Sequence, residues 1–309
     1  MSAQAPKRWG RGRPSDVMDR IVSLPLIGGI RLLRRMRYDR RVAFGGWLVS
    51  RLMGPALGYR RRVMANLNLV FPDMPMAEKR QLCTRALDSM GRSLTELFSP
   101  GDLAKVARNA QISGPGRAAL QEAHEHGRPV VLVSGHFGNY DVWRYALVQQ
   151  GFEVGALYRE MNFTRFNTFY VENIGAIGAP LFPRGRRGLG EMLRHLRAGK
   201  PVGILIDQHM GAGAVIQFLG HPAATALSAA EMALKNDALF IPIYAVRRPD
   251  GLSFDILVED PVAPSDALQM TEAATRSLEA QIMAHPEQWL WTHRRWKTGR
   301  SRKPVTDAV

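Results

Sequence analysis

A histidine and an aspartate stand five residues apart in the stretch GHFGNYD, where an apolar run gives way to an amphipathic segment. On a straight helix, residues five apart point about 140° away from each other, because each residue turns the chain by roughly 100°. His136 and Asp141 can meet only if His136 lies in a turn after a strand and Asp141 in the first turn of the next helix. Gly135 and Gly138 suit such a turn, and Asn139 suits the N-cap. The carboxylate would then orient the imidazole and leave its other nitrogen as a general base.

No nucleophile of the enzyme accompanies this pair in the sequence. The element G-x-S-x-G, which presents a catalytic serine in many hydrolases, is absent, and Ser134 has a glycine on one side only. A histidine base without such a partner activates a hydroxyl group of the substrate or a water molecule. The pair therefore predicts chemistry on an oxygen nucleophile that enters the site from outside.

Metal-binding patterns are weak. The single cysteine, Cys83, excludes an intrachain disulfide and every cysteine-based metal cluster, and its helical-looking surroundings are typical of a small buried residue. The His-Glu-His triplet at 124–126 lacks further ligands at usable spacing. His209 and His221 fit polar lining or surface positions better than ligand positions. We therefore expect no metal site and no cofactor.

Composition and hydrophobic spacing divide the chain into four stretches. Residues 1–14 form a basic tail predicted to be disordered, and residues 299–309 form a tail predicted to be flexible. Residues 15–100 have the spacing of helices, and residues 101–298 alternate short apolar runs with helical stretches. This alternation predicts an α/β fold with a mixed, largely parallel sheet flanked by helices, packed with the helical region as one unit.

The carboxyl ends of the predicted strands are where a site should form, because ligands gather at that edge of a parallel sheet. His136 follows one predicted strand and Asp207 ends another, so both should lie at this edge. The strands are expected at 130–134, 153–158, 202–207, 239–246 and 252–259. The helices between and after them are expected near 139–150, 163–174, 186–198, 224–236 and 271–284.

The net charge of +15 is concentrated toward the amino terminus, where residues 1–62 contain 15 Lys and Arg against 3 Asp and Glu. Such a region can bind nucleic acid, an anionic membrane surface or an acidic protein. Two apolar runs, at 21–30 and 42–59, lie between the arginines and contain Trp47 and Tyr59.

Neither apolar run is long enough to cross a bilayer, because Pro25, Arg31 and Arg51 interrupt them before the roughly 18–20 apolar residues that a span needs. Neither has the small-residue cleavage pattern of a signal peptide. The composition is typical of helices that lie on a membrane with basic side chains at the headgroups. It is equally typical of a solvated basic subdomain whose apolar faces pack on the rest of the protein.

The His–Asp stretch resembles the H-x-x-x-x-D/E motif of the glycerolipid acyltransferase superfamily. The wider pattern is similar to the late (secondary) acyltransferases of lipid A biosynthesis, the lauroyl/myristoyl transferase family. The similarity runs in consistent order over roughly residues 60–297. It includes LYRE at 157–160, LRAGKPVGILIDQHMGAGAVIQFLG at 196–220, ATALSAAEMALK at 224–235, PIYAVRR at 242–248 and PEQWLWTHRRWK at 286–297.

Two features depart from the family pattern. Many members carry a glutamate where this chain has Asp141, and the shorter side chain can still orient a histidine. Many members also have a clear membrane-spanning helix near the amino terminus, where this chain has only interrupted apolar runs. The second departure leaves open whether the amino-terminal part crosses the membrane once or lies along it.

The resemblance implies transfer of a fatty acyl group from acyl carrier protein, or from acyl-CoA, to a hydroxyl of a lipid A precursor. His136 would take the proton from that hydroxyl as its oxygen attacks the thioester carbonyl, and Asp141 would orient His136 and stabilise its charged form. The tetrahedral intermediate needs hydrogen-bond donors, either backbone amides at the helix start, near Asn139, or a nearby cation.

Arginines near the predicted strand ends are further candidates for binding substrate. Arg159, in the element LYRE, would stabilise the intermediate or contact a phosphate, and Asp207 would hold Arg159 or the acceptor sugar. Arg184, followed by two more arginines at 186 and 187, suits phosphate recognition. A structural Arg159–Asp207 pair and solvated arginines at the helix start are the plain alternatives.

The resemblance also implies partners and a location. Acyl carrier protein and an anionic membrane surface would both favour a basic protein, and the expected place is the cytoplasmic face of a bacterial inner membrane. The stretch WTHRRWK at 291–297 could stack on nucleic acid, but the family favours an interfacial anchor or packing onto the active site, so no nucleic-acid partner is expected.

Two other functions stay open from the sequence. One is the same chemistry on another acceptor, namely a lysophospholipid, an ornithine lipid or a glycolipid. The other is a non-catalytic basic protein that binds membranes or nucleic acid through residues 1–62.

Overall fold

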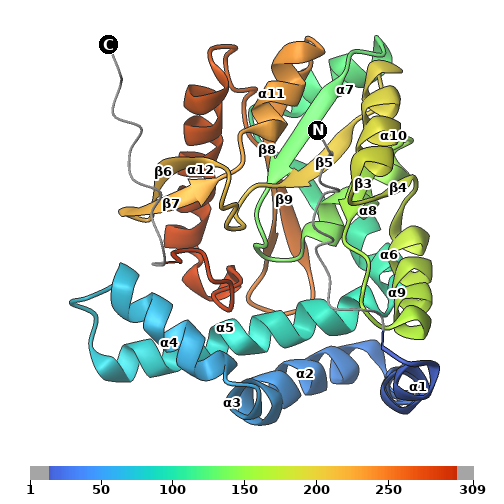
Figure 1. The fold of residues 1–309 in the computed structure, drawn as a ribbon, viewed down its shortest axis with the longest axis vertical. Helices are drawn as coiled ribbons and strands as arrows, with labels where there is room; N and C mark the ends of the chain where they lie inside the picture. Colours follow the sequence, from blue (N-terminus) through green and yellow to red (C-terminus); the bar gives the residue numbers. More distant parts are fainter. Residues whose placement is uncertain (1–13, 298–309) are drawn as a thin grey trace, which may run out of the picture.

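The computed structural model describes residues 14–297, so the two predicted tails at 1–14 and 299–309 lie outside it except for residue 14. A seven-stranded sheet in the order β1-β9-β8-β2-β5-β3-β4 forms the centre (Figure 1). All neighbours are parallel except β8 and β9, which confirms the mixed, largely parallel α/β sheet. Its strands are β1 (Gln111–Ser113), β2 (Val130–Ser134), β3 (Gly155–Tyr158), β4 (Leu181–Pro183), β5 (Val202–Leu205), β8 (Leu239–Arg247) and β9 (Phe254–Val258).

Strand β2 is the centre of the fold because every one of its five residues is buried. Its alternate side chains enter two separate cores, as the twofold alternation of a strand requires. Val130 and Leu132 pack with α8 on one face, and Val131 and Val133 pack with α10 and α11 on the other. A strand buried on both faces gives a continuous apolar run, which is why VVLVS was recognisable in the sequence.

Helices cover both faces of the sheet, as predicted. Helices α6, α7 and α8 contribute to one core, and helices α10, α11 and α12 contribute to the other. Their bounds are α6 (Pro100–Arg108), α7 (Arg117–Glu125), α8 (Tyr140–Gln149), α9 (Thr164–Ile177), α10 (Arg186–Arg197), α11 (Ser228–Lys235) and α12 (Ala267–Ala284), followed by the short 3₁₀ helix η2 (Pro286–Gln288).

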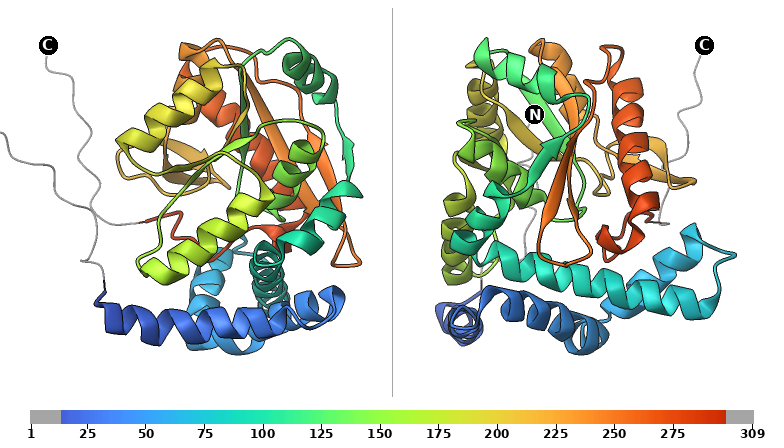
Figure 2. Two further views of the ribbon diagram at one scale, coloured as in Figure 1. Left: turned by 90° about the vertical axis from the view of Figure 1, so that its right-hand side faces the viewer. Right: turned by 180° about the vertical axis from the view of Figure 1, so that it is seen from behind.

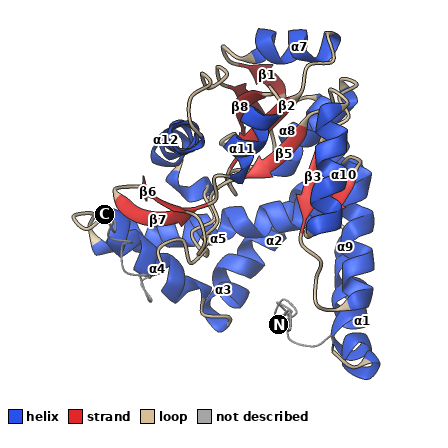
Figure 3. Ribbon diagram, turned by 45° about the horizontal axis from the view of Figure 1, so that its top comes forward, coloured by secondary structure: helices blue, strands red, loops and turns tan. Residues whose placement is uncertain are grey.

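An antiparallel hairpin, β6 (Ala214–Phe218) and β7 (His221–Thr225), stands apart from the main sheet beside α12 (Figure 3). Leu219 and Gly220 form its two-residue turn, and both have positive φ. The predicted helix at 224–236 was wrong at its start, because residues 221–225 pair in β7 and the helix begins only at Ser228. The short edge strands β1 and β4 were also not predicted, since three residues give too little pattern.

The amino-terminal part is helical, as predicted, and lies across one end of the molecule (Figure 2). It comprises α1 (Asp16–Leu33), α2 (Tyr38–Leu48), the π-helical turn η1 (Val49–Met53), α3 (Gly54–Ala56), α4 (Tyr59–Val70) and α5 (Met76–Leu97). Helices α2 and α5 approach closely at two glycines, where a Cβ on Gly91 would lie 2.3 Å from the carbonyl oxygen of Gly45. None of the helices within residues 14–297 combines the length and the apolar character that a bilayer crossing requires.

A buried ion pair joins this helical layer to the sheet. Glu96 on α5 is fully buried, and its two oxygens accept hydrogen bonds of 2.5 and 2.6 Å from the Arg247 guanidinium at the end of β8. Asn139, at the start of α8, donates to the same carboxylate at 2.7 Å. The pair therefore fixes α5 against the turn that carries His136.

Neutralising one member of this pair should destabilise the protein strongly. Glu96→Gln leaves the Arg247 guanidinium buried without its counter-charge, so we expect a loss of about 3–5 kcal/mol in the free energy of unfolding. The same change at the exposed pair Arg187–Glu191 should cost less than about 1 kcal/mol. Urea unfolding of Glu96→Gln and Glu191→Gln measures both, and equal losses would contradict the structural role of the buried pair.

Candidate active site

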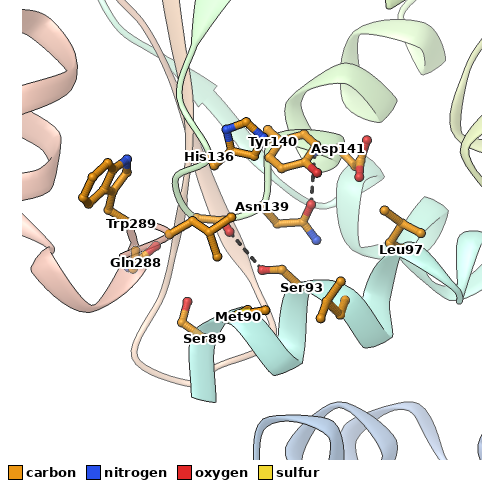
Figure 4. Close-up of a pocket in the computed structure, with 13 residues that line it drawn as sticks. Ser89, Met90, Ser93, Leu97, His136, Asn139, Tyr140, Asp141, Gln288 and Trp289 are labelled. Carbon is orange, nitrogen blue, oxygen red and sulfur yellow. Dashed lines mark hydrogen bonds between the residues drawn. The ribbon is translucent and has the colours of Figure 1, made fainter. Parts of the chain in front are cut away.

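The turn between β2 and α8 has the form predicted from its sequence (Figure 4). Gly138 has a φ of 55°, and a Cβ there would lie 1.8 Å from the carbonyl oxygen of Ala245, so only glycine fits. Asn139 is the N-cap of α8, since its side-chain oxygen accepts from the backbone N–H of Asp141 at 3.0 Å. The turn thus places His136 at the carboxyl edge of the sheet.

The partner of His136 is Asp207, the residue predicted to share this edge. In the β2–β5 register, Ser134 lies opposite Leu205, and His136 and Asp207 follow these two residues by the same distance along the chain. The imidazole Nδ1 lies 2.7 Å from Asp207 Oδ1, and the backbone N–H of His136 donates to Oδ2 at 2.8 Å. One carboxylate therefore holds both the ring and the main chain of His136.

The environment keeps Asp207 charged. Its side chain is fully buried, and the Trp289 Nε1–H adds a third hydrogen bond, at 2.9 Å, to Oδ2. Burial alone would raise the pKa of Asp207, but the charge and hydrogen bonds of His136 more than offset this and hold the pKa well below its usual range. Because the ionised Asp207 can only accept hydrogen bonds, the proton of the neutral imidazole lies on Nδ1. The lone pair that can accept a proton is therefore on Nε2.

Two rings fix the plane of this imidazole. Tyr140 and His293 both meet it edge to face, with centroid distances of 5.4 and 4.6 Å. Burial and the neighbouring His136 lower the pKa of His293 to about 4, so His293 is neutral at physiological pH. The side-chain amide of Gln208 lies 3.3 Å from His136 Nε2 and is the one described group that reaches this nitrogen through a hydrogen bond.

The prediction that Asp141 orients His136 was wrong in its geometry. Asp207 occupies the Nδ1 side of the ring, and in the view of Figure 4 Tyr140 stands between the imidazole and the Asp141 carboxylate. The first turn of α8 directs Asp141 away from the ring. Its side chain is buried and lines the pocket described below, and burial raises its pKa to about 6, partly offset by the charges of Arg144 and His136.

The role predicted for Asp207 also differs from the structure. Asp207 was expected to hold Arg159 or a sugar, but both of its oxygens accept hydrogen bonds from His136 and Trp289. Asn139, expected at the helix start among the groups that stabilise the intermediate, is the predicted N-cap of α8, and its side-chain amide also donates to Glu96. Both residues therefore hold the His136 turn in position through hydrogen bonds.

A segment far along the chain clamps the turn. Leu290 N–H donates to the His136 carbonyl at 2.9 Å, and Gly138 N–H donates to the Gln288 carbonyl at 2.9 Å. Helix α4 holds the same segment from the other side, because Asn66 Nδ2 donates to the carbonyls of Trp291 and His293 at 2.7 and 2.9 Å. Packing of the Trp-rich stretch onto the active site, one of its two predicted roles, is therefore confirmed.

A pocket of about 90 Å³ opens beside His136 (Figure 4). One side is a face of α5, where Met90, Leu94 and Leu97 supply an apolar wall, and the other side is the turn and Leu290. Ser93 on the same helix face donates its hydroxyl to the Gly138 carbonyl at 2.9 Å. His136 thus lines a largely apolar cavity between the sheet and the helical layer.

The predicted arginines lie at the same sheet edge but outside this pocket. Arg159 follows β3 and Arg184 follows β4, and both are exposed. The backbone N–H of Arg184 donates to the carbonyl of Tyr158 at 2.8 Å, which brings the two strand ends together. Arg186 and Arg187 open α10, and Arg187 pairs with Glu191 at 2.9 Å. The structure therefore gathers exposed positive charge two and three strands away from β2.

One group of side chains has the composition of a metal site. Ligand atoms of His136, Asp207 and His293 all lie within 4.8 Å of one another. Both Asp207 oxygens already accept N–H groups, so a cation would have to replace the hydrogen bonds that orient His136. The donor set fits a hydrogen-bonded pair better than a metal. The His-Glu-His triplet contributes nothing here, because His124 stacks on Phe152.

The chain belongs to the family of bacterial lipid A biosynthesis acyltransferases, whose pattern matches residues 20–298. It is 26% identical to the lipid A biosynthesis lauroyltransferase of Escherichia coli over 278 residues, covering 82% of this chain and 89% of that protein. It is 25% identical to a lipid A biosynthesis acyltransferase of Haemophilus influenzae, covering 84% of each. It is 24% identical to the palmitoleoyltransferase of Escherichia coli, covering 83% and 85%. The predicted family is confirmed.

The raised pKa of Asp141 leads to a prediction about the free energy of unfolding. Its folded pKa of about 6 lies above the ordinary value of 3.8, so the folded state disfavours the charged form. The charged carboxylate therefore lowers the free energy of unfolding. This effect is small below about pH 4 and reaches its full size above about pH 6. Asp141→Asn removes this charge, so at pH 7.5 we expect the variant to be more stable than wild type by about 1–3 kcal/mol.

Urea unfolding at pH 4 and pH 7.5 measures this difference. The difference should nearly vanish at pH 4, where Asp141 is protonated in the folded state and lies close to its ordinary pKa in the unfolded state. Asp73→Asn, at an exposed aspartate between α4 and α5, is the control and should change stability little at either pH. An Asp141→Asn protein that is less stable than wild type at pH 7.5 would show that the buried carboxylate is stabilising.

Proposed function

We propose that this acyltransferase of lipid A biosynthesis moves a fatty acyl group from the thioester of acyl carrier protein to a hydroxyl of a lipid A precursor. The observation that carries the proposal is the pair His136–Asp207, which leaves Nε2 as the basic nitrogen of a ring that lines a largely apolar pocket. Within the described residues no serine or cysteine hydrogen-bonds to His136 Nε2: Gln208 is the group at this nitrogen, Ser93 in the pocket donates to the Gly138 carbonyl, and Cys83 is buried on α5. The acceptor hydroxyl is then the nucleophile.

The reaction follows from the proton positions. His136 Nε2 takes the proton of the acceptor hydroxyl while its oxygen forms a bond to the thioester carbonyl carbon. The tetrahedral intermediate collapses, the carbon–sulfur bond breaks, and the leaving thiolate takes the proton from His136. Asp207 stabilises the imidazolium that exists between these steps, and the Asp141 charge adds to this through space. The base ends neutral and ready for another turnover.

Exposed arginines supply the charge that a phosphorylated acceptor requires. Arg159 and Arg184 lie at neighbouring strand ends, and Arg186 follows at the start of α10. Guanidinium groups bind phosphate through paired hydrogen bonds, and a helix start adds favourable backbone N–H groups. We assign these side chains to the acceptor phosphates and not to the reacting carbonyl.

The amino-terminal helices provide a surface for the membrane. Helix α1 buries only Asp19, Ser23 and Ile27, while the apolar side chains on its other faces are exposed. Arg165 on α9 holds α1 to the body through Asp19 at 2.9 Å and Asp16 at 2.7 Å. An exposed apolar helix flanked by arginines fits a position in the headgroup region of the cytoplasmic face of the inner membrane.

Loss of the base or of its partner should abolish transfer. With acyl carrier protein thioester and a lipid A precursor, we expect His136→Ala to lower kcat by at least about 10³-fold. We expect Asp207→Asn to lower it by about 10²–10⁴-fold, because an amide cannot hold the required tautomer. His126→Ala, at an exposed histidine directly after α7, is the control and should keep full activity.

Parallel reactions test the substrates. Replacing the acceptor by a lysophospholipid, an ornithine lipid or a glycolipid, and the donor by acyl-CoA, tests each alternative separately. Near-normal turnover of His136→Ala rejects the base assignment, and transfer only to a different lipid rejects the acceptor. If wild type acylates none of these lipids, the remaining interpretation is a non-catalytic membrane-binding protein.

Charges on the exposed face of α1 should weaken membrane binding. Ile21 and Leu24 are 63% and 56% exposed, so Ile21→Asp/Leu24→Asp removes apolar contact with lipid without disturbing the core. We expect co-sedimentation with anionic vesicles to fall at least about tenfold in affinity, and wild type to bind neutral vesicles more weakly. Val215→Asp, 71% exposed on the distant hairpin, is the control. Equal binding by both variants would exclude α1 as the membrane contact.

A further inference from the structure

The reactive nitrogen of the base already has a hydrogen-bond partner. Gln208 Nε2 lies 3.3 Å from His136 Nε2. Because Asp207 requires the proton on Nδ1, Nε2 can only accept, and the Gln208 amide is the donor. The side chain of Gln208 thus stands where the acceptor hydroxyl must come before it can lose its proton.

The position of Gln208 suits a group that moves during turnover. It directly follows Asp207 beyond the end of β5, and its side chain is exposed. Within the described residues this is the one hydrogen bond of its side chain, and 3.3 Å is long for an N–H donor. An incoming hydroxyl can replace so weak a contact at little cost, and the fold does not depend on it.

Three backbone donors close to the base are already used. The N–H of His136 donates to Asp207, that of Gly138 to the Gln288 carbonyl, and that of Asp141 to Asn139. The start of α8 therefore presents no free amide of these three residues to a reacting carbonyl. A side-chain donor next to His136 Nε2 can supply what these three amides do not.

We propose that Gln208 is a catalytic residue, whose amide leaves His136 when the acceptor hydroxyl binds and then donates to the thioester carbonyl oxygen as that oxygen becomes negative. The inference rests on the proposed acyl transfer. In the intermediate, the attacking oxygen and the oxyanion share one carbon, so a donor that lay against the base is within reach of the oxyanion. The amide gives no proton away, and the proton shuttles only between the hydroxyl, His136 and the thiolate.

Two substitutions of Gln208 test its role as a hydrogen-bond donor separately from the size of its side chain. Gln208→Met keeps the length and removes the donor, so we expect kcat to fall about 10²-fold with little change in KM for the acceptor. Slow hydrolysis of the acyl thioester without acceptor should fall in the same proportion, because water attack forms the same oxyanion. Gln217→Met, at an exposed glutamine on β6, is the matched control and should leave both rates unchanged.

Gln208→Glu adds a readout that a merely structural role would not move. A carboxylate facing Nε2 favours the protonated imidazole. Because the base works only when deprotonated, the acid limb of the kcat/KM profile should move to higher pH. The rate at the plateau should fall below that of Gln208→Met, since a carboxylate repels the oxyanion.

The outcomes are distinct. Transfer by Gln208→Met within threefold of wild type overturns the assignment while leaving the proposed function intact. Loss of transfer with unchanged thioester hydrolysis also overturns it, because the amide would then serve the acceptor and not the oxyanion. If wild type acylates no lipid, the proposed function fails and the inference falls with it.

Discussion

The carboxylate of Asp207 is the interaction on which the site depends. It joins the turn after β2, the end of β5 and the Trp289 segment, which are far apart in the chain. A buried charge is stable only when its oxygens are satisfied, and here three N–H groups satisfy them. The same requirement sets the tautomer of His136 and the position of its main chain. Removing any one of these three donors therefore changes the base as well as the fold around it.

The surroundings of the base combine charge with an apolar environment. Glu96 and Asp207 are fully paired, whereas Asp141 lies in the pocket wall with a raised pKa. Apolar side chains of α5 close the other side of the same cavity. An environment that disfavours charge strengthens every remaining electrostatic contact to the imidazolium. The helical layer thus serves the chemistry directly, because α5 is both its link to the sheet and one wall of the site.

Much of this arrangement could be predicted from the sequence. The apolar run before Gly135 gave β2, Gly138 and Asn139 gave the turn and the cap, and Asp207 was placed at the same edge. The pairing of His136 with Asp207 could not be predicted, because it depends on β5 lying beside β2, and strand order leaves no trace in local periodicity. Gln208 and His293 were missed for the same reason, although each lies within a stretch that carries the family resemblance. Asp141 was paired with His136 because spacing along the chain is visible and distance in space is not.

The clamp formed by residues 288–293 affects how the protein matures. These residues follow every strand of the described part of the chain. A ribosome that has synthesised the whole sheet has therefore not yet synthesised Trp289 or the main-chain groups that hydrogen-bond to the His136 turn. A nascent chain at that stage contains His136 and Asp207 but lacks the residues that hold them in position. Because Trp289 and Trp291 also belong to a hydrophobic core, the site can form only once that core is complete.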